Sequence, residues 1–171
     1  MEQAFCDAIQ FAIEYEKQSQ CFYQDALLKV KNRFAKQALE FLIAEEQTHI
    51  DKIIAFNQHL LGKAEFDLEK ECVTGLPERT KQFLINFTHK EEEVTDASND
   101  IDIYKVAQDT EKKGYELYES VEKSTQDSRL KQFFAFLAAE EKNHYQLLEY
   151  SIKYLEDPSY YFEEAGGWIF G

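Results

Sequence analysis

The chain is poor in residues that interrupt helices, since its 171 residues include only six glycines and two prolines. Glycine and proline dominate turns, so this scarcity predicts long helices joined by few connections. Its three cysteines form no Cys-x-x-Cys pair, which argues against a disulfide framework, a zinc ribbon or a rubredoxin-type iron site. We therefore expect reduced thiols in a cytoplasmic protein.

The chain also lacks long apolar runs and an excess of basic residues. No apolar stretch approaches the ~20 residues that a membrane-spanning helix needs. The opening MEQAFCDAIQ has no basic region followed by an apolar run, so no signal peptide is expected. The net charge of −14 argues against binding to nucleic acid or to an anionic membrane. The length suits one domain with a full core.

The chain does contain a repeat with an offset of 95 residues, found by aligning the sequence with itself. With no gap, KQALEFLIAEEQTH (36–49) aligns with KQFFAFLAAEEKNH (131–144), and EKQSQCFY (16–23) aligns with EKKGYELY (111–118). Apolar residues in each copy recur at intervals typical of one helix face. Each copy therefore predicts a hairpin of two helices, the first with a turn near residue 31 and the second with a turn near residue 126.

The two predicted hairpins span residues 1–62 and 101–157, and a long connection, residues 63–100, joins them. Up-and-down bundles use short loops, so this length predicts a crossover along an all-α four-helix bundle. Within the crossover, Pro77 is placed to open one short helix. Residues 158–171 form an aromatic tail, which we expect to contact a partner or a second copy of the chain.

Each repeat puts glutamate and histidine on a helix face that should be buried. The stretches LIAEEQTH (42–49) and LAAEEKNH (137–144) lie in segments whose apolar residues have helical spacing. Within them, Glu45 and Glu140 precede the inward-facing glutamates and lie about 100° around the helix. We therefore expect Glu45 and Glu140 to face water.

Four glutamates are expected at one height in the bundle. Glu16 and Glu46 are equidistant from the first predicted turn, which places them at the same level on neighbouring helices. Glu111 and Glu141 repeat this arrangement about the second turn. Docking the two hairpins face to face would gather four carboxylates and two imidazoles in one layer of the core.

Such a layer needs compensating charge, because buried carboxylates without partners are costly. Lysine and arginine are absent from these stripes near the acids, whereas two divalent cations would supply +4 against −4. Carboxylate and imidazole ligands together favour iron, or manganese, over calcium or magnesium. The alternative, a metal-free bundle whose acids face solvent, conflicts with the apolar context of both repeats. The candidate metal ligands are Glu16, Glu46, His49, Glu111, Glu141 and His144.

Two tyrosines accompany the candidate ligands. Tyr23 and Tyr118 follow Glu16 and Glu111 by seven residues, two turns further along the same helix face. A hydroxyl at this position can donate a hydrogen bond to a metal-bound carboxylate. The same positions also suit ordinary core aromatics, and the sequence leaves both interpretations open.

The doubled pattern Glu-x6-Tyr followed by Glu-x2-His resembles the rubrerythrin branch of the ferritin-like superfamily. The resemblance covers both hairpins, about three-quarters of the chain. It implies a ferritin-like four-helix bundle with two iron ions at mid-height, bound by the six candidate ligands. It also implies that Glu46 and Glu141 bridge the two ions and that the protein is a homodimer.

The chain departs from that family's pattern in two ways. Rubrerythrins carry an extra carboxylate one turn after the third-helix glutamate, where this chain has Gly114, which weakens the case for a redox-linked ligand switch. They usually carry a rubredoxin domain as well, and its absence implies a separate electron-donor protein.

The expected function is an oxidoreductase that reduces hydrogen peroxide or dioxygen in defence against oxidative stress. The alternative is an iron-binding or ferroxidase protein for iron storage or handling, including as cargo of another protein shell.

Overall fold

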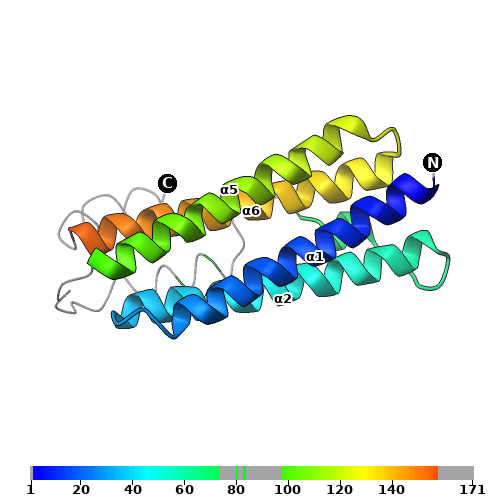
Figure 1. Cartoon of the computed structure of the whole chain (residues 1–171). Helices are drawn as coiled ribbons and strands as arrows, with labels where there is room; N and C mark the ends of the chain where they lie inside the picture. Colours follow the sequence, from blue (N-terminus) through cyan, green and yellow to red (C-terminus); the bar gives the residue numbers. More distant parts are fainter. Residues whose placement is uncertain (1, 74–79, 81–82, 84–97, 158–171) are drawn as a thin grey trace.

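The structure is a computed structural model that describes residues 2–73, 80, 83 and 98–157. Figure 1 shows two long helical hairpins packed against each other, α1 with α2 and α5 with α6. No strand occurs in these described residues, so the predicted all-α bundle is confirmed. The helices are α1 (Glu2–Leu27), α2 (Arg33–Leu60), the short α3 (Leu68–Glu71), α5 (Ser98–Ser124) and α6 (Ser128–Glu156).

The long helices begin and end where the sequence predicts turns. Asn32 caps α2, because its side-chain oxygen accepts a hydrogen bond from the Ala35 amide at 3.1 Å. Asp127 caps α6 in the same way, accepting from the Arg129 amide at 2.9 Å. Gly62 follows the end of α2 with φ of 69°, a left-handed conformation that glycine adopts without strain. Both predicted turns are confirmed.

The start of α5 is bound to the turn between α1 and α2. The buried Asp100 carboxylate accepts hydrogen bonds from the backbone amides of Lys31, at 3.0 and 3.1 Å, and Asn32, at 2.7 Å. One turn later, the Tyr104 hydroxyl donates to the Ala35 carbonyl at 2.7 Å. Since α2 starts at this same turn, α5 begins at the opposite end of the bundle from the end of α2.

The connection between α2 and α5 therefore spans the length of α2, whose 28 residues extend about 42 Å at 1.5 Å each. Its described residues follow this course, since Phe66 packs on Phe56 near the end of α2 and Phe83 packs on Phe41 nearer its start. The ring centroids are 5.6 and 4.9 Å apart. The predicted helix at Pro77 lies outside the described residues, whereas α3 is a helix that the sequence analysis did not predict.

Two apolar clusters fill the interior, one toward each end of the bundle. The first contains Leu39 and Leu148 and lies toward the α1–α2 turn. The second contains Phe56 and Phe133, whose rings stack with centroids 4.1 Å apart. The two clusters leave a polar layer between them, which is sealed from both ends of the bundle.

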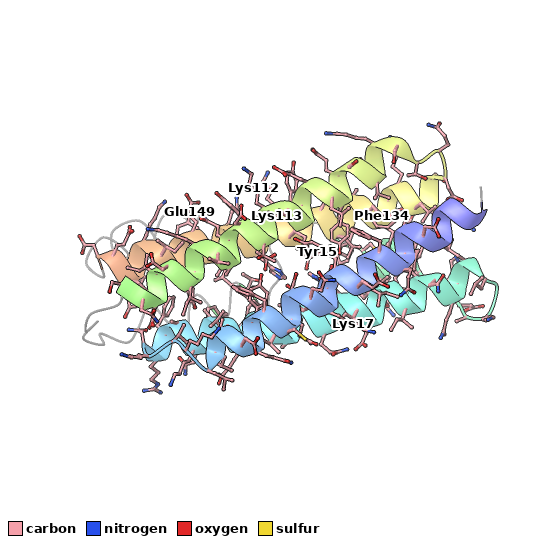
Figure 2. The ribbon with its side chains drawn as sticks, in the orientation of Figure 1. Tyr15, Lys17, Lys112, Lys113, Phe134 and Glu149 are labelled. Atoms are coloured by element: carbon pink, nitrogen blue, oxygen red, sulfur yellow. The ribbon has the colours of Figure 1, made fainter. Side chains whose placement is uncertain are left out.

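Charged side chains cover the outer faces of the helices. Figure 2 shows Lys17, Lys112 and Lys113 pointing away from the bundle, whereas Tyr15 lies between α1 and α5. Lys113 pairs with Asp109 one turn earlier at 2.6 Å, in the solvent-exposed spacing that helices favour. None of the described helices combines the length and apolar character that crossing a membrane requires.

We predict that Asp100→Ala loosens the junction between the hairpins, because the amides of Lys31 and Asn32 lose their acceptor. The free energy of unfolding should fall by about 1–3 kcal/mol, the usual cost of leaving buried donors unpaired. Urea unfolding monitored by circular dichroism measures this loss. Asp102→Ala, at an exposed position on the same helix, is the matched control. Equal stabilities of the two variants would contradict the prediction.

Candidate metal centre

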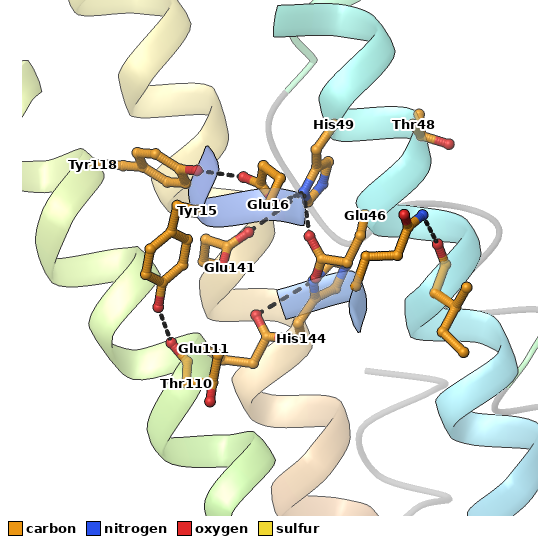
Figure 3. Close-up of polar contacts among 12 residues, drawn as sticks. Tyr15, Glu16, Glu46, Thr48, His49, Thr110, Glu111, Tyr118, Glu141 and His144 are labelled. Carbon is orange, nitrogen blue, oxygen red and sulfur yellow. Dashed lines mark hydrogen bonds and ion pairs between the residues drawn. The ribbon is translucent and has the colours of Figure 1, made fainter. Parts of the chain in front are cut away.

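A layer of six polar side chains crosses the middle of the bundle (Figure 3). Each of the six residues is at most 1% exposed, although all of them can be ionised. All four long helices contribute, and the structure thus brings together every residue that the sequence analysis predicted as a ligand. They are Glu16 on α1, Glu46 and His49 on α2, Glu111 on α5, and Glu141 and His144 on α6.

The two imidazoles lie at the centre of this layer. The rings of His49 and His144 stack with centroids 5.1 Å apart and planes inclined by 16°. Nδ1 of His49 lies 3.4 Å from Glu16 Oε2, in its own hairpin, and 3.4 Å from Glu141 Oε1, in the other. This histidine therefore faces carboxylates from both hairpins.

The second histidine repeats the arrangement. Nδ1 of His144 lies 3.5 Å from Glu111 Oε2, in its own hairpin, and 3.7 Å from Glu46 Oε1, in the other. Glu46 also approaches His49, at 3.6 Å, so this carboxylate lies beside both imidazoles. Neither hairpin alone contains a complete set of these contacts, and the layer exists only when the two hairpins dock.

Most of the ligand-type atoms in the layer have no hydrogen-bond partner. Both carboxylate oxygens of Glu46 and both ring nitrogens of His49 are buried and unpartnered. Glu46, His49, Glu141 and His144 each offer one ligand atom, and these atoms lie within 4.8 Å of one another. Unpaired buried polar atoms are costly, so the layer fits cations bound by carboxylate oxygen and imidazole nitrogen. The other unpartnered ligand atoms are Glu16 Oε2, Glu111 Oε2, Glu141 Oε1 and His144 Nδ1.

Two tyrosines orient the outer glutamates of this layer, each from the opposite hairpin. Tyr118 of α5 donates its hydroxyl hydrogen bond to Oε1 of Glu16 (Figure 3). Tyr23 of α1 donates in the same way to Oε1 of Glu111. Both tyrosine rings are also fully buried. Each tyrosine is therefore a core aromatic and a hydrogen-bond donor to a carboxylate, the two interpretations that the sequence left open. Because each hydroxyl occupies Oε1, Oε2 of the same carboxylate remains unpartnered and free to bind a cation.

Burial keeps these hydroxyl groups protonated. Burial first, and then the negative charge of Glu111, raise the pKa of Tyr23 well above its usual value. Burial and the charge of Glu16 do the same to the pKa of Tyr118. Both tyrosines therefore act as hydrogen-bond donors throughout the physiological pH range.

Without a metal, the layer retains protons. Burial first, and then the charge of Glu16, raise the pKa of both Glu46 and Glu141 well above the usual value. Burial opposes the charged form of His49, but the facing carboxylates, Glu16 first, outweigh it and raise the His49 pKa. Burial also opposes ionisation of Glu16, yet the neighbouring Glu46 carboxyl group and the charge of His49 lower its pKa to about 2. Binding of a cation would displace the retained protons.

A third tyrosine, which the sequence analysis did not single out, lies beside the layer. Tyr15 donates its hydroxyl hydrogen bond to the Thr110 carbonyl at 2.5 Å (Figure 3). Its ring lies against Gly114, where an added Cβ would approach Tyr15 Cε1 to 2.9 Å and Glu141 Oε2 to 2.4 Å. No side chain fits at position 114 while both neighbours stay in place. Glycine in a helix interior costs about 1 kcal/mol, and this close approach accounts for it here.

The prediction that Glu45 and Glu140 face water is wrong. They are only 3% and 7% exposed. The first, described part of the crossover lies near this side of the bundle, where Lys52 of α2 donates to the Glu71 carbonyl and pairs with the Glu71 carboxylate. Burial raises the pKa of Glu140, whose Oε1 accepts a hydrogen bond from the Asn143 amide at 3.3 Å. Glu140 lies beside the six-residue layer and not within it, since the charges of His49 and His144 oppose this rise in its pKa.

We predict that metal-free protein loses stability as the pH rises from about 5 to 8. Glu46, Glu141 and His49 have raised pKa values in the folded state, against 4.5 for glutamate and 6.5 for histidine. The folded state therefore binds more protons than the unfolded state above pH 4.5, and unfolding becomes easier as those protons are lost. The lowered pKa of Glu16 adds stability that is already complete above about pH 4.5, so it stays constant across this range.

Urea unfolding of chelator-treated protein at several pH values measures this dependence. A free energy of unfolding that stays constant or rises between pH 5 and 8 would contradict the electrostatic description of the layer. Metal-loaded protein is the control, and its stability should rise with pH, because the ligands bind a cation in their deprotonated forms.

Comparison with known proteins agrees with this geometry. The family model named Rubrerythrin matches residues 7–151, which include most of both hairpins and all six residues of the layer. No curated protein and no solved structure matches the chain. The match covers well over half of the sequence, and the chain belongs to the rubrerythrin family.

Proposed function

We propose that this protein binds two iron ions in the six-residue layer and uses them to reduce hydrogen peroxide. The observation that supports this proposal is the set of buried carboxylate oxygens and imidazole nitrogens without hydrogen-bond partners. Membership of the rubrerythrin family favours iron over the other metals that such donors accept.

The charges and the pairing of residues support two ions rather than one. Four carboxylates carry −4 when ionised, which two divalent cations balance. Glu16 and His49 would hold one ion and Glu111 and His144 the other, because each pair already lies together at 3.4 to 3.5 Å. Glu46 approaches both histidines and is placed to reach both ions. Its repeat counterpart Glu141 would do the same from the other hairpin.

The protein's contribution to the reaction is to position charge and exclude bulk water. Reduction of hydrogen peroxide to two water molecules consumes two electrons and two protons, and bound iron would supply one electron per ion. Tyr118 and Tyr23 hold Glu16 and Glu111 in place, while the two apolar clusters close the layer at both ends. A separate electron-donor protein would restore the electrons, since the sequence has no Cys-x-x-Cys pair to bind a second iron centre.

One observation favours a second candidate, a ferroxidase that oxidises iron with dioxygen for storage or handling. Position 114 has no room for the extra carboxylate associated with a redox-linked ligand switch, because Glu141 and Tyr15 occupy that space. The two candidates differ in their oxidant, since a peroxidase prefers hydrogen peroxide and a ferroxidase of this kind prefers dioxygen.

We predict that iron(II)-loaded protein reacts faster with hydrogen peroxide than with dioxygen at equal concentrations. Stopped-flow absorbance after anaerobic loading measures both rate constants, and a peroxidase should show a ratio of about tenfold or more in favour of peroxide, at least 1.4 kcal/mol in activation free energy. A faster reaction with dioxygen would overturn the peroxidase proposal in favour of the ferroxidase.

Paired variants on the same two helices provide the control for this measurement. Glu46→Ala with Glu141→Ala should abolish both metal binding and the reaction, because these two carboxylates reach across between the hairpins. Glu45→Gln with Glu140→Gln changes the adjacent buried acids, which lie outside the layer, and should leave both intact. Equal loss in the two double variants would indicate a general loss of folding, which circular dichroism would reveal.

A further inference from the structure

Among the residues that the structure describes, the six-residue layer has no open route to solvent. Its members are at most 1% exposed, and apolar clusters close it toward both ends of the bundle. On the α2–α6 side, the buried Glu45 and Glu140 lie beside the layer. A hydrated cation can therefore enter only if some covering side chain moves.

The side between α1 and α5 is covered by three tyrosines that differ in how firmly they are held. Tyr23 and Tyr118 are fully buried, and each donates to a carboxylate, a type of hydrogen bond about twice as strong as one between neutral groups. Tyr15 is only partly buried, and its hydroxyl donates to a neutral backbone carbonyl, that of Thr110. Of the three, Tyr15 is the side chain that moves at least cost.

The surroundings of Tyr15 also suit movement of its ring. The ring lies against Gly114, which presents no side chain that would interlock with it. The same glycine leaves Oε2 of Glu141 close to the ring, since both the ring and this oxygen approach the position where a Cβ would be. Displacement of the Tyr15 ring would therefore uncover a ligand-type carboxylate without any shift of the helices.

The internal repeat shows that the layer can form without a tyrosine packed on a glycine. At the offset of 95 residues, the counterparts of Tyr15 and Gly114 are Thr110 and Ser19. The six polar residues and the two fully buried tyrosines all obey the repeat, whereas the tyrosine packed on glycine occurs in only one half. The asymmetry gives the layer one face that can open.

We propose that Tyr15 is the gate through which divalent cations enter and leave the metal centre, with Gly114 providing the space in which its ring is seated. The proposal rests on the proposed metal site. It assigns Tyr15 a role in the rate of exchange and not in affinity, because the ring covers the ligands without supplying one.

The test uses Co(II), whose visible absorbance reports binding without redox chemistry. Entry is followed by stopped-flow mixing of full-length metal-free protein with Co(II), and exit by adding excess chelator to the loaded protein. Tyr15→Phe removes the hydrogen bond and should raise both rate constants by about fivefold, the kinetic equivalent of one net hydrogen bond. Tyr15→Ala, which also removes the ring, should raise them further. The equilibrium dissociation constant should stay unchanged in both variants.

Two further variants make the outcome specific. Tyr115→Phe removes a hydroxyl on the outer face of α5, where it donates to Glu119 at 2.9 Å, and should keep wild-type rates. Gly114→Ala places a Cβ against Glu141 and should weaken affinity, since that carboxylate must shift. Circular dichroism confirms that each variant is folded.

Wild-type rate constants in both folded Tyr15 variants would overturn the gate while leaving the metal centre intact. Faster exit with unchanged entry would also overturn it, because that result means weaker binding and not freer passage. Failure of the wild-type protein to bind Co(II) would overturn the metal centre and the gate together.

Discussion

The burial of four carboxylates and two imidazoles in one layer is the constraint on which the rest of this structure depends. Such a layer is unfavourable in a metal-free core, and protons retained on Glu46, Glu141 and His49 relieve it only in part. Cations relieve it fully. The two apolar clusters, the buried tyrosines and the docking of the hairpins then serve to hold a set of ligands that would otherwise separate.

The internal repeat explains how one short sequence pattern, present once in each hairpin, builds the whole six-residue layer. Each histidine contacts glutamates of both hairpins, and each buried tyrosine donates across to the opposite hairpin. Because these contacts join the two hairpins, the layer forms only when the hairpins dock. Asp100 fixes the relative placement, because it ties the start of the second hairpin to the turn of the first.

Much of this arrangement could be predicted from the sequence, because helical spacing and the repeat determine which residues share a height. The turns, the two hairpins and the gathering of six polar side chains follow from that periodicity. Periodicity within a helix does not report what covers its outer face, so the burial of Glu45 and Glu140 beneath the crossover was missed. It also leaves open which glutamate each tyrosine would bind, since Tyr23 contacts Glu111 and not the Glu16 of its own helix.

Tyr15 illustrates a second limit. A tyrosine beside a ligand glutamate carries no periodic signal, and its role becomes visible only through its contact with Gly114 on another helix. The glycine was the available clue, because a glycine in the interior of a long helix indicates a close approach by another part of the chain. Where the repeat is broken, the two halves of the layer are covered by different side chains.

The central claim is that the six-residue layer holds a pair of metal ions. Native mass spectrometry of metal-free protein titrated anaerobically with iron(II) tests it most directly, since it counts the ions bound to each chain. The account predicts saturation at two ions per chain. Saturation at one ion, or no binding at all, would contradict it.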